Sequence, residues 1–149
     1  MKVHWLALLV VVGAMLSAPA VSGTIVEEKN GYIVTPGNET LIMPDLAAMS
    51  SSTISQGQTQ SYSSYVPSGK TAFLADLNWG NPSNSLSLTI TAPDARLGPY
   101  YDSADGTVDG RINLRISKST GLASGTWWSY IYGDHVVGSQ SYSYTPSLS

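Results

Sequence analysis

From residue 57 onward, apolar and polar side chains alternate along the chain with a period of two. The segments 85–91 and 111–117 show this alternation most strictly, and weaker runs cover 62–66, 72–79 and 127–132. A period of two is typical of strands that bury one face. Gly, Pro, Asn and Asp separate the runs, as in the turns of an antiparallel sheet. The pattern therefore predicts an all-β domain, with a last strand over roughly 140–145.

The apolar positions of these runs define the expected core. They are Phe73, Leu77, Trp79, Leu86, Leu88, Ile90, Ile112, Leu114, Ile116, Trp127 and Ile131. Two antiparallel sheets packed as a β-sandwich, jelly-roll or immunoglobulin-like, would bury them. A small closed barrel is the alternative.

Residues 24–53 are predicted to form a leader ahead of a main domain at 54–149. Two β-rich stretches flank Asn30-Gly31, a dipeptide that favours a type I′ hairpin turn. Residues 44–49 are compatible with one helical turn, and Ser50–Thr53 with a polar linker.

Residues 1–23 have the pattern of a secretory signal peptide. A basic start is followed by an apolar run over 5–16, too short for the ~20 residues of a membrane-spanning helix. Small residues place the expected cleavage after Ala20 or Gly23. An uncleaved anchor is the alternative. The sequence thus predicts an exported protein, extracellular or at the cell surface, with no later membrane span.

Composition narrows the possible partners and chemistry. The 149 residues are 42% hydrophobic and only 11% charged, with a net charge of −3 and no cluster of Lys and Arg. Nucleic acid is therefore not an expected partner. Cysteine is absent, which excludes disulfides, thiolate metal sites and cysteine nucleophiles.

Several motifs, in order, resemble the bacterial and archaeal pre-peptidase C-terminal domain. They are Gly57 to Tyr62 leading into Val66-Pro67-Ser68-Gly69, then 86–90 with Pro93-Asp94, Gly125-Thr126-Trp127 running to Tyr132-Gly133, and Ser139 to Tyr142. The segments 76–80, 100–106 and 109–112 are similar to a variant in secreted proteins of methanogenic archaea. The resemblance covers roughly residues 54–145.

This resemblance implies a β-sandwich that accompanies secreted enzymes without catalysing a reaction itself. Some members of the family bind calcium, and members attached to collagenases bind substrate. The implied function is that of an accessory or binding module.

The sequence lacks a recognisable catalytic constellation. A Ser-His-Asp triad needs a histidine base. After signal removal only His135 remains, next to Asp134 in an expected hairpin turn. The chain has no H-E-x-x-H, G-x-S-x-G or phosphate-loop motif. We therefore expect that the protein is not an enzyme.

One loop contains a candidate calcium site. Asp102, Asp105 and Asp109 lie within eight residues of each other, and calcium prefers carboxylate and carbonyl oxygens. The competing interpretation is that Asp105-Gly106 and Asp109-Gly110 are only turn dipeptides.

Exposed aromatic side chains are the second candidate site. Trp128, Tyr130 and Tyr132 share the strand face opposite Trp127 and Ile131. Tyr142 and Tyr144 are expected on a neighbouring strand. Such rings can bind a glycan or the apolar surface of a cell-envelope protein. Alternatively, they stabilise the sheet through cross-strand pairs or pack against a second sheet.

The resulting hypothesis is a secreted, non-catalytic binding module. A hydrolase with an unrecognised carboxylate site and a structural envelope subunit are the alternatives.

Asn38 begins an Asn-x-Thr glycosylation sequon.

Overall fold

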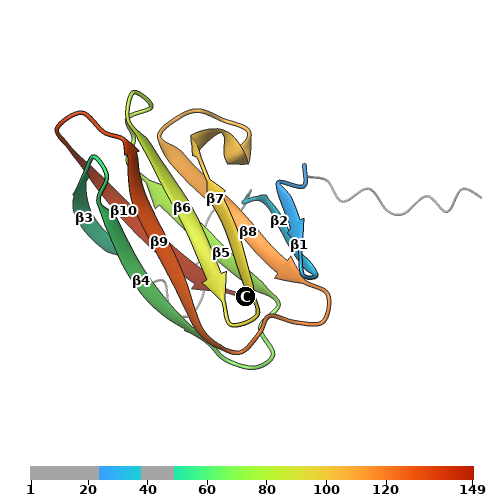
Figure 1. Ribbon diagram of the computed structural model, residues 1–149. Coiled ribbons are helices and arrows are strands. Elements are labelled where there is room, and N and C mark those ends of the chain that lie inside the picture. The colour runs from blue at the N-terminus through green and yellow to red at the C-terminus, as the bar shows by residue number, and fades with distance from the viewer. Residues whose placement is uncertain (1–23, 38–48) are drawn as a thin grey trace, which may run out of the picture.

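The computed structural model describes residues 24–37 and 49–149. Within these residues the chain forms ten strands and one 3₁₀ turn, η1 (Asp102–Asp105). The strands pair antiparallel in two separate sheets (Figure 1). The all-β prediction is confirmed.

The larger sheet, sheet A, has six strands. In spatial order they are β1 (Glu27–Lys29), β2 (Tyr32–Pro36), β8 (Arg111–Lys118), β5 (Ala72–Asn78), β10 (Ser139–Leu148) and β3 (Ser50–Ser55). Strand β10 lies between β5 and β3. Its first half pairs with β3, and its second half pairs with β5.

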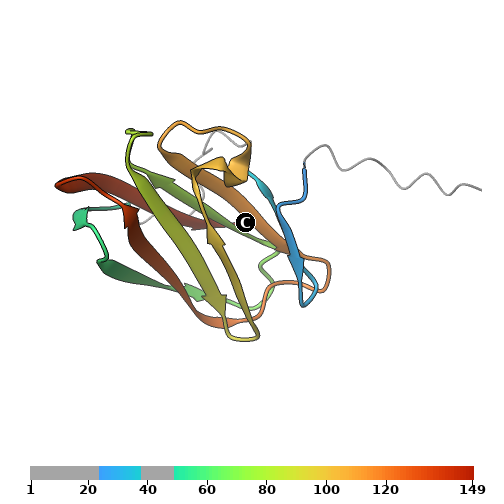
Figure 2. The same cartoon turned by 45° about the horizontal axis from the view of Figure 1, so that its top comes forward.

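The smaller sheet, sheet B, has four strands. In spatial order they are β4 (Thr59–Val66), β9 (Gly125–His135), β6 (Ser85–Ala92) and β7 (Ala95–Tyr100). The turned view shows sheet B facing sheet A (Figure 2). From β3 to β6 the chain changes sheet with each strand, and it does so again from β7 to β10.

One hydrophobic core fills the space between the sheets. Every core residue expected from the alternation is buried. At its centre Trp127 of sheet B stacks on Phe73 of sheet A, with ring centroids 5.0 Å apart. The edge of Tyr32, also in sheet A, meets Trp127 at 5.6 Å. Aromatic rings thus join the sheets.

The expected hairpin at Asn30-Gly31 is present, but it is not part of a leader. Asn30 and Gly31 have φ of 51° and 81°, as a type I′ turn requires. Strand β2 pairs with β8, and Tyr32 and Val34 are fully buried. The hairpin therefore extends sheet A, and the predicted boundary at residue 53 is wrong.

Two further strands escaped the sequence analysis. Ser50–Thr53, predicted to be a linker, begins the edge strand β3, which buries only Ile54. Strand β7 has its alternation interrupted by Gly98-Pro99. Edge strands pair through their backbone, so a polar sequence can form them.

Some expectations lie outside the described residues. They are the signal peptide at 1–23, the helical turn at 44–49 apart from Met49, and the sequon at Asn38. Within the described residues, no helix is long and apolar enough to cross a membrane.

The two adjacent tryptophans of β9 should differ sharply in their contribution to stability. Trp127 is fully buried, whereas 40% of Trp128 is exposed. Trp127→Ala should lower the free energy of unfolding by about 3–5 kcal/mol, the range for a deleted core aromatic. Trp128→Ala should lower it much less. Urea unfolding of both variants measures the difference, and a larger loss for Trp128→Ala would reverse the assigned faces.

Candidate binding groove

A groove of about 740 Å³ opens at the side of the sandwich, between the edge of β4 and the end of β10. It collects residues from five strands, β3, β4, β5, β9 and β10, and from the turn after β4. Its lining consists of Ser50, Ser61, Tyr62, Ser63, Ser64, Tyr65, Pro67, Lys70, Phe73, Trp128, Tyr144, Pro146, Ser147 and Leu148.

Among the described residues, side chains at one end of this side close the space between the two sheets, and the groove lies toward the other end. Near the turn between β3 and β4, the Gln60 amide donates to the carbonyl of Thr53 at 2.8 Å. Beside it the hydroxyls of Tyr62 and Tyr142 lie 2.7 Å apart, and Tyr142 donates to Gln60 Oε1. These side chains close the space between the sheets.

Toward the other end of β4, the described residues leave the space between the sheets open. Strand β3 begins at Ser50, which pairs with Tyr144. Among the described strands, residues 145–148 of β10 therefore pair only with β5. The side of β10 that faces away from β5 is left uncovered by β3, and the groove opens there.

The groove combines aromatic rings with hydroxyl groups. Tyr65 and Trp128 are 70% and 40% exposed at its rim. Phe73 and Tyr144 are fully buried and contribute to its apolar floor. Lys70 is the one charged residue of the described lining. Such a surface can stack on a flat ligand and form hydrogen bonds with it, but it offers no carboxylate or imidazole for proton transfer.

Tyr144 is held as a neutral hydroxyl. Its oxygen lies 2.5 Å from Ser129 Oγ. Burial raises the pKa of the Tyr144 hydroxyl above its usual value, and the hydrogen bond with Ser129 offsets only part of this effect. The floor of the groove therefore remains uncharged at physiological pH.

The predicted aromatic face of β9 is only partly in the groove. Trp128 lines it, whereas Tyr130 and Tyr132 follow on the same face outside its lining. The sequence predicted Tyr142 and Tyr144 on a strand beside β9. The structure instead places both on β10. They belong to sheet A and point into the core, because alternation specifies a strand's buried face but not its neighbour.

The candidate calcium loop uses its carboxylates internally. Asp102 is buried, and its carboxylate accepts the backbone N–H groups of Asp109, Gly110 and Arg111 at 2.9–3.2 Å. The Asp105 carboxylate accepts the N–H groups of Thr107 and Asn113.

The carboxylates of Asp102 and Asp105 thus serve the loop itself, and the calcium site stays a prediction. Asp109 is exposed, unlike Asp102. Among residues 24–37 and 49–149, no three acidic or histidine side chains are placed to hold a metal ion. The aspartates stabilise the turn that returns the chain to β8.

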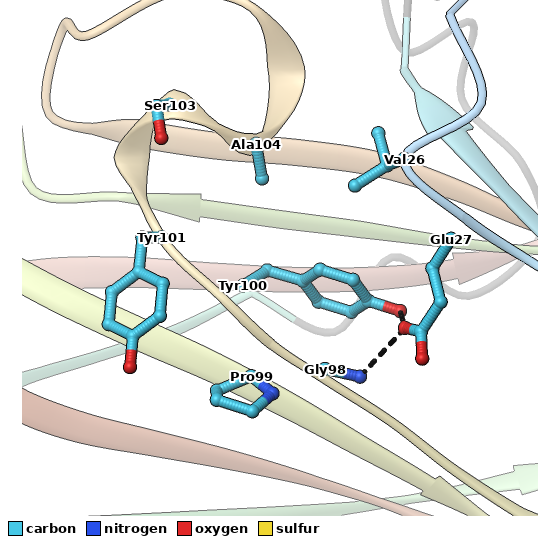
Figure 3. Close-up of a pocket in the computed structure, with 8 residues that line it drawn as sticks. All are labelled: Val26, Glu27, Gly98, Pro99, Tyr100, Tyr101, Ser103 and Ala104. Carbon is cyan, nitrogen blue, oxygen red and sulfur yellow. Dashed lines mark hydrogen bonds between the residues drawn. The ribbon is translucent and has the colours of Figure 1, made fainter.

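A smaller cavity, of about 300 Å³, lies where β1 approaches the end of β7 (Figure 3). The Glu27 carboxylate accepts the Tyr100 hydroxyl at 2.5 Å and the Gly98 N–H at 3.0 Å. Burial is the main cause that raises the pKa of the Tyr100 hydroxyl, and the hydrogen bond with Glu27 adds to it. The hydroxyl therefore keeps its proton and remains a donor. The one carboxylate of this lining thus fastens two strands together.

His135 lies exposed at the end of β9, apart from the groove lining. Tyr65 and Lys70 were not predicted from the sequence as site residues. The exposure of Tyr65 follows from its alternation with Ser64 and Val66, so a signal was present. The position of Lys70 depends on the turn between β4 and β5, which the alternation does not describe.

Comparison with known proteins places the chain near an archaeal sequence. No family model matches the chain. A stretch of 41 residues, 28% of the chain, is 51% identical to an uncharacterized protein of Archaeoglobus fulgidus. The match covers 56% of that protein, so the chain spans little more than half the length of the relative.

The role of Asp102 can be tested against its exposed neighbour. Asp102→Ala leaves buried N–H groups without an acceptor and should lower the free energy of unfolding by about 1–3 kcal/mol. Asp109→Ala should change it by no more than about 0.5 kcal/mol. Calcium and a chelator should give wild-type protein the same melting temperature. If calcium raised the melting temperature of wild-type protein and both substitutions abolished that rise, the calcium site would be supported.

Asp105 should make stability depend on pH. Burial is the largest cause that raises the pKa of its carboxyl, and the charges of Asp109 and Asp102 add to it, although hydrogen bonds from Asn113 and Thr107 oppose them. A raised pKa in the folded state means that the free energy of unfolding falls as pH rises through that pKa.

The variant Asp105→Asn removes this titration and keeps an acceptor oxygen. The free energy of unfolding of the variant minus that of wild type should therefore increase from pH 3 to pH 7. Urea unfolding across that range measures this difference. Glu28→Gln, at an exposed position, is the control for the removal of one carboxylate elsewhere on the protein. If this difference instead decreased toward neutral pH, the raised pKa of the Asp105 carboxyl would be contradicted.

Proposed function

We propose that this protein is an exported, non-catalytic binding module whose ligand lies in the groove beside β4. The single observation that carries this proposal is the groove itself, with exposed Trp128 and Tyr65 at its rim and an uncharged floor. Aromatic residues on a largely neutral surface provide contact area without the desolvation cost of buried charges. The apolar run and small residues over 1–20 support export to the cell surface or beyond.

The topology supports an assignment within the β-sandwiches. With the β1–β2 hairpin set aside, the strand orders β8-β5-β10-β3 and β4-β9-β6-β7 are those of an eight-stranded jelly roll. We propose this topology, and with it the resemblance to the pre-peptidase C-terminal domain. Jelly rolls include lectin domains, which by analogy favours a binding function.

A neutral glycan of the cell envelope is the ligand that the groove favours. Sugar rings present flat apolar faces and many hydroxyls, and the groove combines aromatic rings with the hydroxyls of Ser61, Ser63 and Ser64. Lys70 is the one charged residue of its described lining, so a strongly anionic polymer would find little to pair with. The exposed rings of Trp128 and Tyr65 are the expected stacking surfaces.

Removing Trp128 should weaken glycan binding while the fold is retained. Trp128→Ala should raise the dissociation constant about 30-fold, equivalent to roughly 2 kcal/mol for a central aromatic contact. The measurement is affinity electrophoresis in gels that contain neutral envelope polysaccharide.

The matched control is Tyr101→Ala, which removes an exposed ring beside the smaller cavity and should leave binding unchanged. Equal effects of the two substitutions would exclude the groove as the binding site. Retained glycan binding in Trp128→Ala would likewise refute the proposal.

A further inference from the structure

At one side of the molecule, side chains of one edge strand protect the edge of another. An unpaired edge exposes backbone N–H and C=O groups that attract other strands. Strand β1 of sheet A lies close to β7 of sheet B. The Lys29 ammonium donates to the carbonyl of Arg96 at 2.8 Å, and Glu27 accepts the N–H of Gly98. Side chains of β1 thus occupy the backbone groups of β7.

The edge of β3, on the opposite side, is also partly occupied. Gln60 donates to the carbonyl of Thr53, and Gln58 Oε1 accepts the N–H of Ser55 at 2.8 Å. Both glutamines come from β4 or the turn before it. Backbone groups of β3 are therefore bonded to side chains as well.

The edge of β4 has no such protection. Among the described strands, β4 pairs only with β9. No hydrogen bond from any described residue reaches the backbone groups of 59–66 that point away from β9. The strand has eight residues and contains no proline and no charged side chain. It thus lacks the features by which proteins prevent pairing at an exposed edge.

We infer that β4 pairs antiparallel with β4 of a second copy of this chain, across a twofold axis. An uncharged strand can lie against itself without placing like charges opposite each other. Among the described residues, sheet B has a single unprotected edge, because side chains of β1 bind the backbone of its other edge strand, β7. Pairing through one edge closes after two copies, whereas an open filament would need two different surfaces.

The axis passes through Ser63, the exposed residue at the middle of β4. Residues directly opposite in a sheet share one face, so an axis at this position keeps the outer faces of both copies aligned. Trp128 lies opposite Ser63 on β9. The dimer therefore places both Trp128 side chains on one outer face, separated by the two β4 strands. Ser61–Tyr65 of β4 also line the groove, so the second copy borders the groove, although the inference itself is argued from the backbone edge of β4.

The absence of native cysteine makes the pairing directly measurable. Ser63→Cys should form a dimer with a short bismaleimide, since the two introduced thiols would lie close to the axis. Ser103→Cys, at an exposed position in η1 beside the far edge, should remain a single chain. Light scattering of purified wild-type protein should give twice the mass of one chain.

Charge substitutions at the axis identify the partner as a second copy. Ser63→Lys and Ser63→Asp should each reduce the mass to one chain, because like charges then face each other. An equimolar mixture of the two variants should recover the doubled mass. A wild-type mass of one chain at every concentration, or a mass that grows beyond two chains, would overturn the inference. So would equal cross-linking of Ser63→Cys and Ser103→Cys. Glycan affinity is a separate measurement, so this inference and the proposed function can fail independently.

Discussion

The structure depends on one stack of aromatic rings that crosses the space between the sheets. Trp127 comes from sheet B, whereas its partners Phe73 and Tyr32 belong to sheet A. The indole N–H of Trp127 also donates to the carbonyl of Ala123, which fixes the turn ahead of β9. The strand's register, and therefore the outward position of Trp128, follows from this single buried ring. The groove's aromatic rim is thus positioned by the core beneath it.

Tyrosine hydroxyls take the place that ion pairs hold in more highly charged proteins. Tyr32 donates to Asp94 at 2.6 Å, and its oxygen accepts the N–H of Ala123. Burial and Asp94 raise the pKa of Tyr32 to about 12, so the hydroxyl keeps its proton as a donor. Burial alone would raise the pKa of Asp94, but hydrogen bonds from Lys118 and Tyr32 hold it below its usual value. In a chain with few charges, the buried hydroxyl of Tyr32 thus links strand β2 to the segments around Asp94 and Ala123.

The sequence was sufficient for the buried faces but not for the assembly of the strands. Alternation located the core and the opposite orientations of Trp127 and Trp128, because a period of two specifies which side chains are buried. It missed β3, whose backbone pairing needs no apolar pattern, and it misplaced Tyr144 because pairing partners lie far apart in sequence. The groove could not be foreseen for the same reason. It joins residues of β3, β4, β5, β9 and β10, and it opens beside residues 145–148 of β10, which do not pair with β3.

The position of β10 in sheet A has a consequence for how the chain acquires its fold. This strand ends at Leu148, yet it lies inside the sheet, between β5 and β3. Until residues 139–148 have been synthesised, β3 lacks its one described neighbour and β5 is left at an edge. Contacts between segments so distant in sequence also form slowly. A nascent chain of this protein therefore stays without a completed sheet A until residues 139–148 are available to pair with β3 and β5.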